Sequence, residues 1–202
     1  MRVALPTGRL EDPSWAWLGR HGFIRQDAGG RRLWVQLCNL DVAMVRGRDI
    51  PHLLAEKAVD AAILGRDIVE ESDVPLWASG DLGFGRCRLM LAVPKSAAAA
   101  KRPLRRIATR YPEITRRWLS SRHMEAEVLA LGGAVEAAPW LGVADGIVDI
   151  VETGTTLRAN GLIAIETVLP CYATLVTLSG HGAIAESLMN EGRERDRAVG
   201  EA

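Results

Sequence analysis

The run of residues from Gly146 to Leu157, GIVDIVETGTTL, places the strongest constraint on what this chain can fold into. Its first half, Gly146 to Val151, is a short apolar run rich in β-branched residues, which is typical of a buried strand. Turn-forming residues follow from Glu152 to Thr156, and helix-compatible residues begin at Leu157. The sequence therefore predicts a strand, a tight turn and the start of a helix.

The residues of this turn have the chemistry of a phosphate site. A helix start presents unpaired backbone N–H groups and the positive end of the helix dipole, and Gly154 lets the backbone come close to a ligand. Three hydroxyl groups add hydrogen-bond donors, those of Thr153, Thr155 and Thr156. Asp149 and Glu152 bracket the strand end, where carboxylates suit sugar hydroxyls or Mg²⁺. The combination favours a phosphorylated sugar as the ligand, although turns of this composition also simply cap helices.

Short apolar runs alternate with helix-compatible segments along the rest of the chain, which predicts an α/β fold with mainly parallel strand pairing. Ligands of such sheets bind at the carboxyl ends of the strands. The residues predicted to follow strand ends form a basic rim suited to a polyphosphate: Thr7, Gly8, Arg9, Arg46, Arg48 and Arg66. Each arginine taken alone is more typical of an ordinary solvated surface. Gly83 and Gly85 punctuate a further turn that either admits a ligand or forms a bulge.

Composition and charge argue against several classes of protein. The chain has 202 residues with 25 basic and 25 acidic side chains, a balance unlike that of a general nucleic-acid or anionic-membrane binder. The N-terminal MRVALPTGRL lacks the apolar core of a signal peptide, and no apolar run approaches the roughly 20 residues of a membrane span. Three scattered cysteines, Cys38, Cys87 and Cys171, fit neither a metal site nor a disulfide framework. We therefore expect a cytoplasmic protein that binds anionic ligands through local arginines.

The signature stretch also matches a known family. The chain resembles the ATP phosphoribosyltransferases, the first enzymes of histidine biosynthesis, at positions that keep the family spacing: Glu136, Gly142, Ala144, Ile147, Asp149, Ile150, Thr153, Gly154, Thr156 and Leu157. Further similar segments are LPTGRL at the start, DLGFGRCRL in the middle and RIATRYPEITRRWL after it. The length resembles the short form of the family, which lacks the C-terminal regulatory domain of the long form.

The resemblance implies two α/β domains joined by crossing strands, as in periplasmic solute-binding proteins of type II, with the active site in the cleft between them. The Pro-bounded segment from Pro94 to Pro103, PKSAAAAKRP, and the region near Pro170 fit as the two crossings. We therefore predict a discontinuous first domain, residues 1–93 and 170–202, and a second domain, residues 94–169, that carries the signature.

The resemblance also implies an activity. Family members transfer the phosphoribosyl group of 5-phosphoribosyl 1-pyrophosphate to N1 of the adenine of ATP, release pyrophosphate and require Mg²⁺. The turn from Thr153 to Thr156 would then cradle the 5-phosphate, while Asp149 and Glu152 would hold ribose hydroxyls or the metal. The phosphates of ATP or the leaving pyrophosphate would contact Gly8, Arg9, Arg48, Arg66, Gly83 and Gly85. Short-form members act with a regulatory subunit that resembles histidyl-tRNA synthetase, in a hetero-octamer.

Several residues depart from the family pattern. Thr7 stands where a lysine is usual and Thr174 where an arginine is usual, while Tyr172 replaces a small residue. Residues 132–134, Gly-Gly-Ala, replace a loop that usually carries two polar side chains. These departures lie outside the phosphoribosyl signature, and lost cations weaken the binding of a polyanion, so they bear on the acceptor. Two alternatives stay open: a diverged paralogue that uses another acceptor base, and a non-catalytic binding or scaffold subunit.

Overall fold

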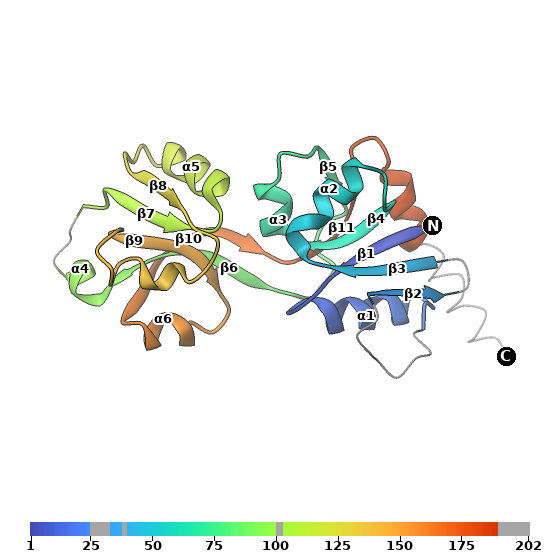
Figure 1. Ribbon diagram of the computed structural model, residues 1–202, viewed down its shortest axis with the longest axis horizontal. Coiled ribbons are helices and arrows are strands. Elements are labelled where there is room, and N and C mark those ends of the chain that lie inside the picture. Colours follow the sequence, from blue (N-terminus) through green and yellow to red (C-terminus); the bar gives the residue numbers. More distant parts are fainter. Residues whose placement is uncertain (25–32, 38–39, 100–102, 190–202) are drawn as a thin grey trace. The chain divides into compact units, whose positions relative to one another are not determined.

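The computed structural model describes residues 1–24, 33–37, 40–99 and 103–189, and the chain divides into two compact units. The first comprises Met1–Gly85 and Tyr172–Ala202, and the second comprises Arg86–Cys171. Each unit is built on one β-sheet with helices packed against it (Figure 1). The predicted α/β class with two domains is confirmed. No helix in the described part of the chain is long and apolar enough to cross a membrane.

The sheet of the first unit has the strand order β2-β3-β1-β4-β11-β5. Its strands are β1 (Arg2–Pro6), β2 (Trp34–Leu37), β3 (Leu40–Val45), β4 (Ala61–Gly65), β5 (Leu76–Ala78) and β11 (Ala173–Leu178). The central strand β1 pairs in parallel with β3 and β4, as predicted, whereas β2, β5 and β11 pair antiparallel with their neighbours. The strand β11 is antiparallel because the chain re-enters the unit at Tyr172, whose carbonyl accepts a hydrogen bond from Arg66 N just past the end of β4.

Both faces of this sheet are covered. The helices are α1 (Glu11–Arg20), η1 (Gly47–Asp49), α2 (Ile50–Ala55) and α3 (Arg66–Glu71), with a further helical segment at residues 182–189. Successive residues of β1 point to opposite faces: Val3 and Leu5 share an apolar cluster with Leu18 of α1, whereas Ala4 shares one with Leu54 of α2. Burial on both faces explains the near-continuous apolar character of the central strands.

The sheet of the second unit has the strand order β10-β6-β9-β7-β8. Its strands are β6 (Cys87–Pro94), β7 (Arg106–Thr109), β8 (Glu127–Ala130), β9 (Gly146–Val151) and β10 (Leu162–Cys171). Its helices are α4 (Lys95–Ala99), α5 (Pro112–Ser121), η2 (Val135–Ala137) and α6 (Thr155–Ala159). The strand β7 pairs in parallel with β8 and β9, so the carboxyl ends of these three strands meet at one edge (Figure 1).

The two faces of the second sheet pack against different elements. Residues of β7 and β9 share an apolar cluster with η2 and α6: Ala108, Ile147, Val151, Val135 and Leu157. The side chain of Thr109 lies on the opposite face, because neighbouring strand residues alternate, and it contacts Thr115 of α5. The helical elements of the signature, η2 and α6, therefore pack on the same face of the sheet that contains β9.

The predicted domain boundaries need correction. We expected the first domain to extend to residue 93, but the unit boundary lies at Gly85, before β6 begins. The reason is that β6 pairs with β9 and, along its whole length, with β10, so it belongs to the second sheet. Cys171 pairs with Cys87 and stays in the second unit for the same reason. The predicted connection after Pro94 begins instead with α4, also in the second unit.

Candidate active site

The predicted strand, turn and helix start are present around Gly154. Strand β9 ends at Val151, and α6 begins at Thr155. Gly154 lies between them with φ +74°, a left-handed backbone conformation that glycine adopts without the strain of a side chain. The hydroxyl groups of Thr153 and Thr155 lie 3.1 Å apart, which indicates a hydrogen bond across the turn. The signature residues therefore form a compact, hydroxyl-lined turn at the carboxyl edge of the second sheet.

An arginine that sequence reasoning missed folds back over this turn. Arg158 donates from Nη1 to the carbonyl oxygen of Thr153, at 3.0 Å, and from Nη2 to Oγ1 of Thr155, at 3.2 Å. A Cβ added at Gly154 would lie 3.1 Å from Nη1, so the glycine also leaves room for the guanidinium. Because α6 has only five residues, its dipole is small, and Arg158 supplies the positive charge at the turn. The sequence did contain a signal for this contact: Arg158 lies three residues after Thr155, and residues three apart on a helix are neighbours on its surface.

The second missed arginine is Arg110, which follows β7. Its Nη2 donates to Oδ1 of Asp149 at 3.0 Å, and the side chain of Asp149 is 8% exposed against 35% for that of Arg110. Both side chains lie on the sheet face that carries η2 and α6, because Ala108 and Ile147 point there and residues two apart share a face. The candidate carboxylate Asp149 is therefore buried beneath the turn and ion-paired.

The pKa of Arg110 reflects this acidic environment. Burial alone would lower the pKa of its guanidinium, but the charge and hydrogen bond of Asp149, with smaller contributions from Tyr111 and Glu136, raise it above its ordinary value. Arg110 is thus permanently charged. Glu136, the first residue of the sequence signature, acts on the same guanidinium as Asp149, which gives a physical reason for their joint presence.

A buried hydroxyl fixes the backbone that carries Arg110. Thr109 donates from Oγ1 to the carbonyl oxygen of Val148 at 2.7 Å, and the same Oγ1 accepts a hydrogen bond from the backbone N–H of Tyr111 at 2.9 Å. Thr109 is fully buried. Thr109 therefore ties the end of β7 to the neighbouring strand β9, and its hydroxyl also holds the backbone just after Arg110.

In the first unit, the predicted rim residues follow the carboxyl ends of β1, β3 and β4. Thr7 donates its backbone N–H to the carbonyl oxygen of Val45, which places the loops after β1 and β3 side by side. Arg9 and Arg48 are exposed, as a role in binding a polyanion requires. Parallel pairing thus brings Gly8, Arg9, Arg48 and Arg66 to one edge of the sheet, as the sequence predicted.

The glycine turn is tied to this edge by Arg9. Nη1 of Arg9 donates to the carbonyl oxygen of Gly85 at 3.1 Å, and Gly83 donates its backbone N–H to Oδ1 of Asp81 at 2.8 Å. Gly85 has φ +68°, and a Cβ there would lie 2.4 Å from Cδ2 of Leu10. Gly85 is therefore needed for packing inside the unit, which is a structural reason for this glycine independent of any ligand.

The surroundings of the other two rim arginines, Arg66 and Arg48, differ. Arg66 lies 3.4 Å from Oε1 of Glu70, and its guanidinium stands 5.6 Å from the ring centroid of Tyr172. The departure at Tyr172 thus supplies an aromatic face that holds a rim arginine. Arg48 lines a small pocket of about 160 Å³ together with Pro51, His52, Ile68, Glu71, Ser72 and Asp73. Thr174, where the family usually has an arginine, is buried in β11 opposite Leu64.

Metal binding has no dedicated protein site in the described ranges, where no group of three His, Cys, Asp or Glu side chains lies close enough to hold an ion. Oδ1 of Asp149 is occupied by Arg110, which lowers its capacity to act as a metal ligand. Glu152 is exposed at the turn.

The fold and the site define a class. Two α/β units, each with helices packed on one sheet, define the fold of the periplasmic-binding-protein type. The chain superposes on the VFT2 domain of Bordetella pertussis BvgS with a TM-score of 0.61. That match covers 95% of this chain and 85% of the other at 17% identity, and it shows the fold alone.

The chain belongs to the ATP phosphoribosyltransferase family. The family model described as HisG, ATP phosphoribosyltransferase, matches residues 46–191. An ATP phosphoribosyltransferase of Thermococcus gammatolerans is 44% identical over 178 residues, which cover 87% of this chain and 86% of the relative. A solved ATP phosphoribosyl transferase (HisG:HisZ) complex from Thermotoga maritima matches with a TM-score of 0.77 and 28% identity, over 96% of this chain and 97% of that one.

Proposed function

We propose that the protein catalyses the first step of histidine biosynthesis, the transfer of phosphoribose from 5-phosphoribosyl 1-pyrophosphate to N1 of ATP with release of pyrophosphate. One observation carries the proposal. The signature turn around Gly154, with Asp149 below it, stands at the carboxyl edge of a parallel sheet in a chain 44% identical to an ATP phosphoribosyltransferase. Family membership supplies the reaction, and the site supplies the groups for the donor.

The donor site uses the turn as a phosphate cradle. The hydroxyls and backbone of Thr153, Gly154, Thr155 and Thr156 bind the 5-phosphate, and Arg158 adds a charge-assisted donor beside them. Asp149 and Glu152 accept hydrogen bonds from the ribose hydroxyls. The reaction is displacement at an anomeric carbon with oxocarbenium character, so it depends on holding the ribose in place and on stabilising the departing pyrophosphate. The residues described above perform the first of these tasks.

The acceptor and the leaving group are assigned to the first unit. Arg9, Arg48 and Arg66, with the backbone at Gly8, Gly83 and Gly85, contact the phosphates of ATP or the pyrophosphate. The exposure of Arg9 and Arg48 supports this role, because a polyanion can reach them without unfolding any packed element. Arg66 binds phosphate in exchange for its contact with Glu70.

Magnesium is carried to the site by the substrates. When bound, Mg²⁺ neutralises phosphate charge and assists the departure of pyrophosphate. Glu152 is the better candidate for a protein ligand, since Oδ1 of Asp149 is already paired with Arg110.

A second subunit completes the enzyme. The matched Thermotoga maritima structure is a HisG:HisZ complex, and this supports a regulatory partner for the present chain. We place that partner, a subunit resembling histidyl-tRNA synthetase, in a hetero-octamer with it. Nothing points to nucleic acid or a membrane as a partner, and the cytoplasmic location expected from the sequence remains a prediction.

The test is a direct assay. The purified chain is mixed with 5-phosphoribosyl 1-pyrophosphate, ATP and Mg²⁺, with and without the histidyl-tRNA-synthetase-like subunit from the same source, and N1-phosphoribosyl-ATP is followed by ultraviolet absorbance. Product in either mixture supports the proposal and shows how far catalysis depends on the partner. Donor binding by calorimetry without product favours another acceptor base. Loss of donor binding as well indicates a scaffold subunit.

A further inference from the structure

The ion pair between Arg110 and Asp149 is built differently from an ordinary surface pair. Asp149 as a residue is only 6% exposed, and its Oδ1 receives Nη2 of Arg110 at 3.0 Å. Its other carboxylate oxygen, Oδ2, receives no hydrogen bond from any residue in the described part of the chain. Oδ2 is not one of the buried side-chain atoms that lack a partner in the described part of the chain, so it is open to solvent. A ligand hydroxyl can therefore reach it and take the place of water.

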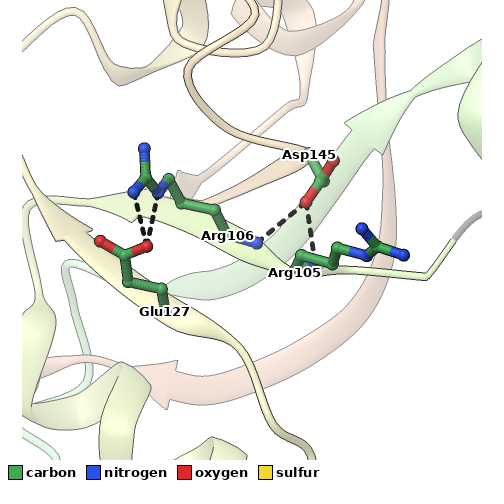
Figure 2. A network of polar contacts seen from close by, with 4 residues as sticks. All are labelled: Arg105, Arg106, Glu127 and Asp145. Carbon is green, nitrogen blue, oxygen red and sulfur yellow. Dashed lines mark hydrogen bonds and ion pairs between the residues drawn. The ribbon is translucent and has the colours of Figure 1, made fainter.

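Strand β7 offers a comparison at its other end. Arg106 pairs there with Glu127 through Nε and Nη2, at 2.8 and 2.6 Å, close to the bond between Asp145 and the backbone N–H groups of Arg105 and Arg106 (Figure 2). The side chains of that pair are 44% and 60% exposed, so solvent screens it and its contribution is small. The pair of Arg110 and Asp149 is less exposed to solvent than the pair of Arg106 and Glu127. It lies about 13 Å further along the strand, at the edge that carries the signature turn.

The position of Arg110 is fixed by its surroundings. The hydrogen bonds of Thr109 hold the backbone just before it, and parallel pairing of Thr109 with Val148 sets the next residues, Arg110 and Asp149, side by side. A rigid, planar guanidinium on a fixed backbone orients a carboxylate better than a flexible ammonium does.

We propose that Arg110 is a positioning residue for the phosphoribosyl donor: it holds Asp149 through Oδ1 and thereby presents Oδ2 to a ribose hydroxyl. The inference deepens the proposed function and rests on it. Arg110 acts through Asp149 and does not itself touch the substrate. The ribose is held by a carboxylate that cannot rotate away, so the anomeric carbon keeps its place while the pyrophosphate departs.

The effect of removing Arg110 follows from this. In Arg110→Gln the carboxylate of Asp149 loses its fixed orientation, and affinity for the donor falls about tenfold to a hundredfold, the value of a hydrogen bond to a charged group. The affinity for ribose 5-phosphate falls by the same factor, whereas the affinity for pyrophosphate, which lacks the ribose, does not change. Arg110→Lys keeps the charge without the rigid, planar guanidinium and recovers part of the affinity.

The experiment is a double-mutant cycle read by calorimetry with three probes: 5-phosphoribosyl 1-pyrophosphate, ribose 5-phosphate and pyrophosphate. The variants are Arg110→Gln, Asp149→Asn and the double variant, with Arg106→Gln as a matched control that removes the same charge from the other end of β7. We expect Arg110→Gln to have little further effect in the Asp149→Asn background, because the two residues act as one unit. The control binds all three probes like the unmodified chain.

Each of the following outcomes overturns the proposal. Additive losses would show that Arg110 contacts the ligand independently of Asp149, and equal losses for pyrophosphate would show that it binds phosphate. Donor affinity in Arg110→Gln equal to that in Arg106→Gln would show a purely structural pair. Should Arg110→Gln not fold, the comparison of Arg110→Lys with the unmodified chain decides, since full affinity in Arg110→Lys contradicts the requirement for a rigid guanidinium. If the unmodified chain itself binds neither 5-phosphoribosyl 1-pyrophosphate nor ribose 5-phosphate, the proposed function has failed and this inference with it.

Discussion

Replacing Gly154 by alanine tests the signature turn most directly. Gly154 has φ +74°, and an L-residue held in this left-handed region costs about 1–2 kcal/mol. The new Cβ would also lie 3.1 Å from Nη1 of Arg158, which is tighter than ordinary contact. The guanidinium is the end of a flexible side chain and will move, so the steric cost is small but the hydrogen bond to Thr153 is lost. Stability and donor affinity should therefore both fall.

Gly142 provides the matched control. Its φ is +72°, almost the same as that of Gly154, but a Cβ there would meet nothing within 4 Å. Gly142→Ala should thus share the backbone strain and spare the phosphate cradle. For a chain of this size each 1 kcal/mol lowers the unfolding midpoint by about 2–4 °C, so both variants should melt about 2–8 °C lower.

The two variants should separate in donor binding. Calorimetry with 5-phosphoribosyl 1-pyrophosphate should show about a tenfold weaker Kd for Gly154→Ala, because a charge-assisted hydrogen bond is displaced, and an unchanged Kd for Gly142→Ala. Unchanged donor affinity in both variants would refute the reasoning, since backbone strain would then be the only effect of the substitution at Gly154. Equal losses in both would show that strain anywhere in the second unit disturbs the site.

Three further results are expected. In calorimetry, Arg158→Gln should lower the affinity for ribose 5-phosphate about tenfold and leave the affinity for pyrophosphate unchanged, because the guanidinium lies at the 5-phosphate cradle. An equal loss of affinity for both ligands would reject that placement. Thr109→Val should lower the free energy of unfolding by about 1–3 kcal/mol in urea titrations, because the buried N–H of Tyr111 loses its acceptor. An unchanged midpoint would contradict this account. Thr7→Lys should lower the KM for ATP by up to about fivefold, since an exposed cation adds a modest, screened attraction, and a change in donor KM alone would show the loop to be misassigned.

The sequence by itself determined the local parts of the site. Gly154 and the threonines around it are contiguous, and a turn between a β-branched run and a helix start is set by conformational preferences that act within a few residues. The rim was predictable for a related reason. Each of Arg9, Arg48 and Arg66 follows a short apolar run, and parallel strands bring such positions to one edge whatever their order in the sheet.

Only the tertiary structure decided which distant residues meet. Arg110 and Asp149 are 39 residues apart, and their ion pair depends on β7 lying beside β9, which no local pattern encodes. The unit boundary at Gly85 likewise depends on the pairing of β6 with β9 and β10. The apolar sequence of β6 would suit a strand of either sheet, so the sequence alone does not assign it to one of them. The residues of the turn are neighbours along the chain, whereas strand order is fixed by the burial of whole sheet faces. The turn was therefore visible in the sequence, and the pairing of Arg110 with Asp149 was not.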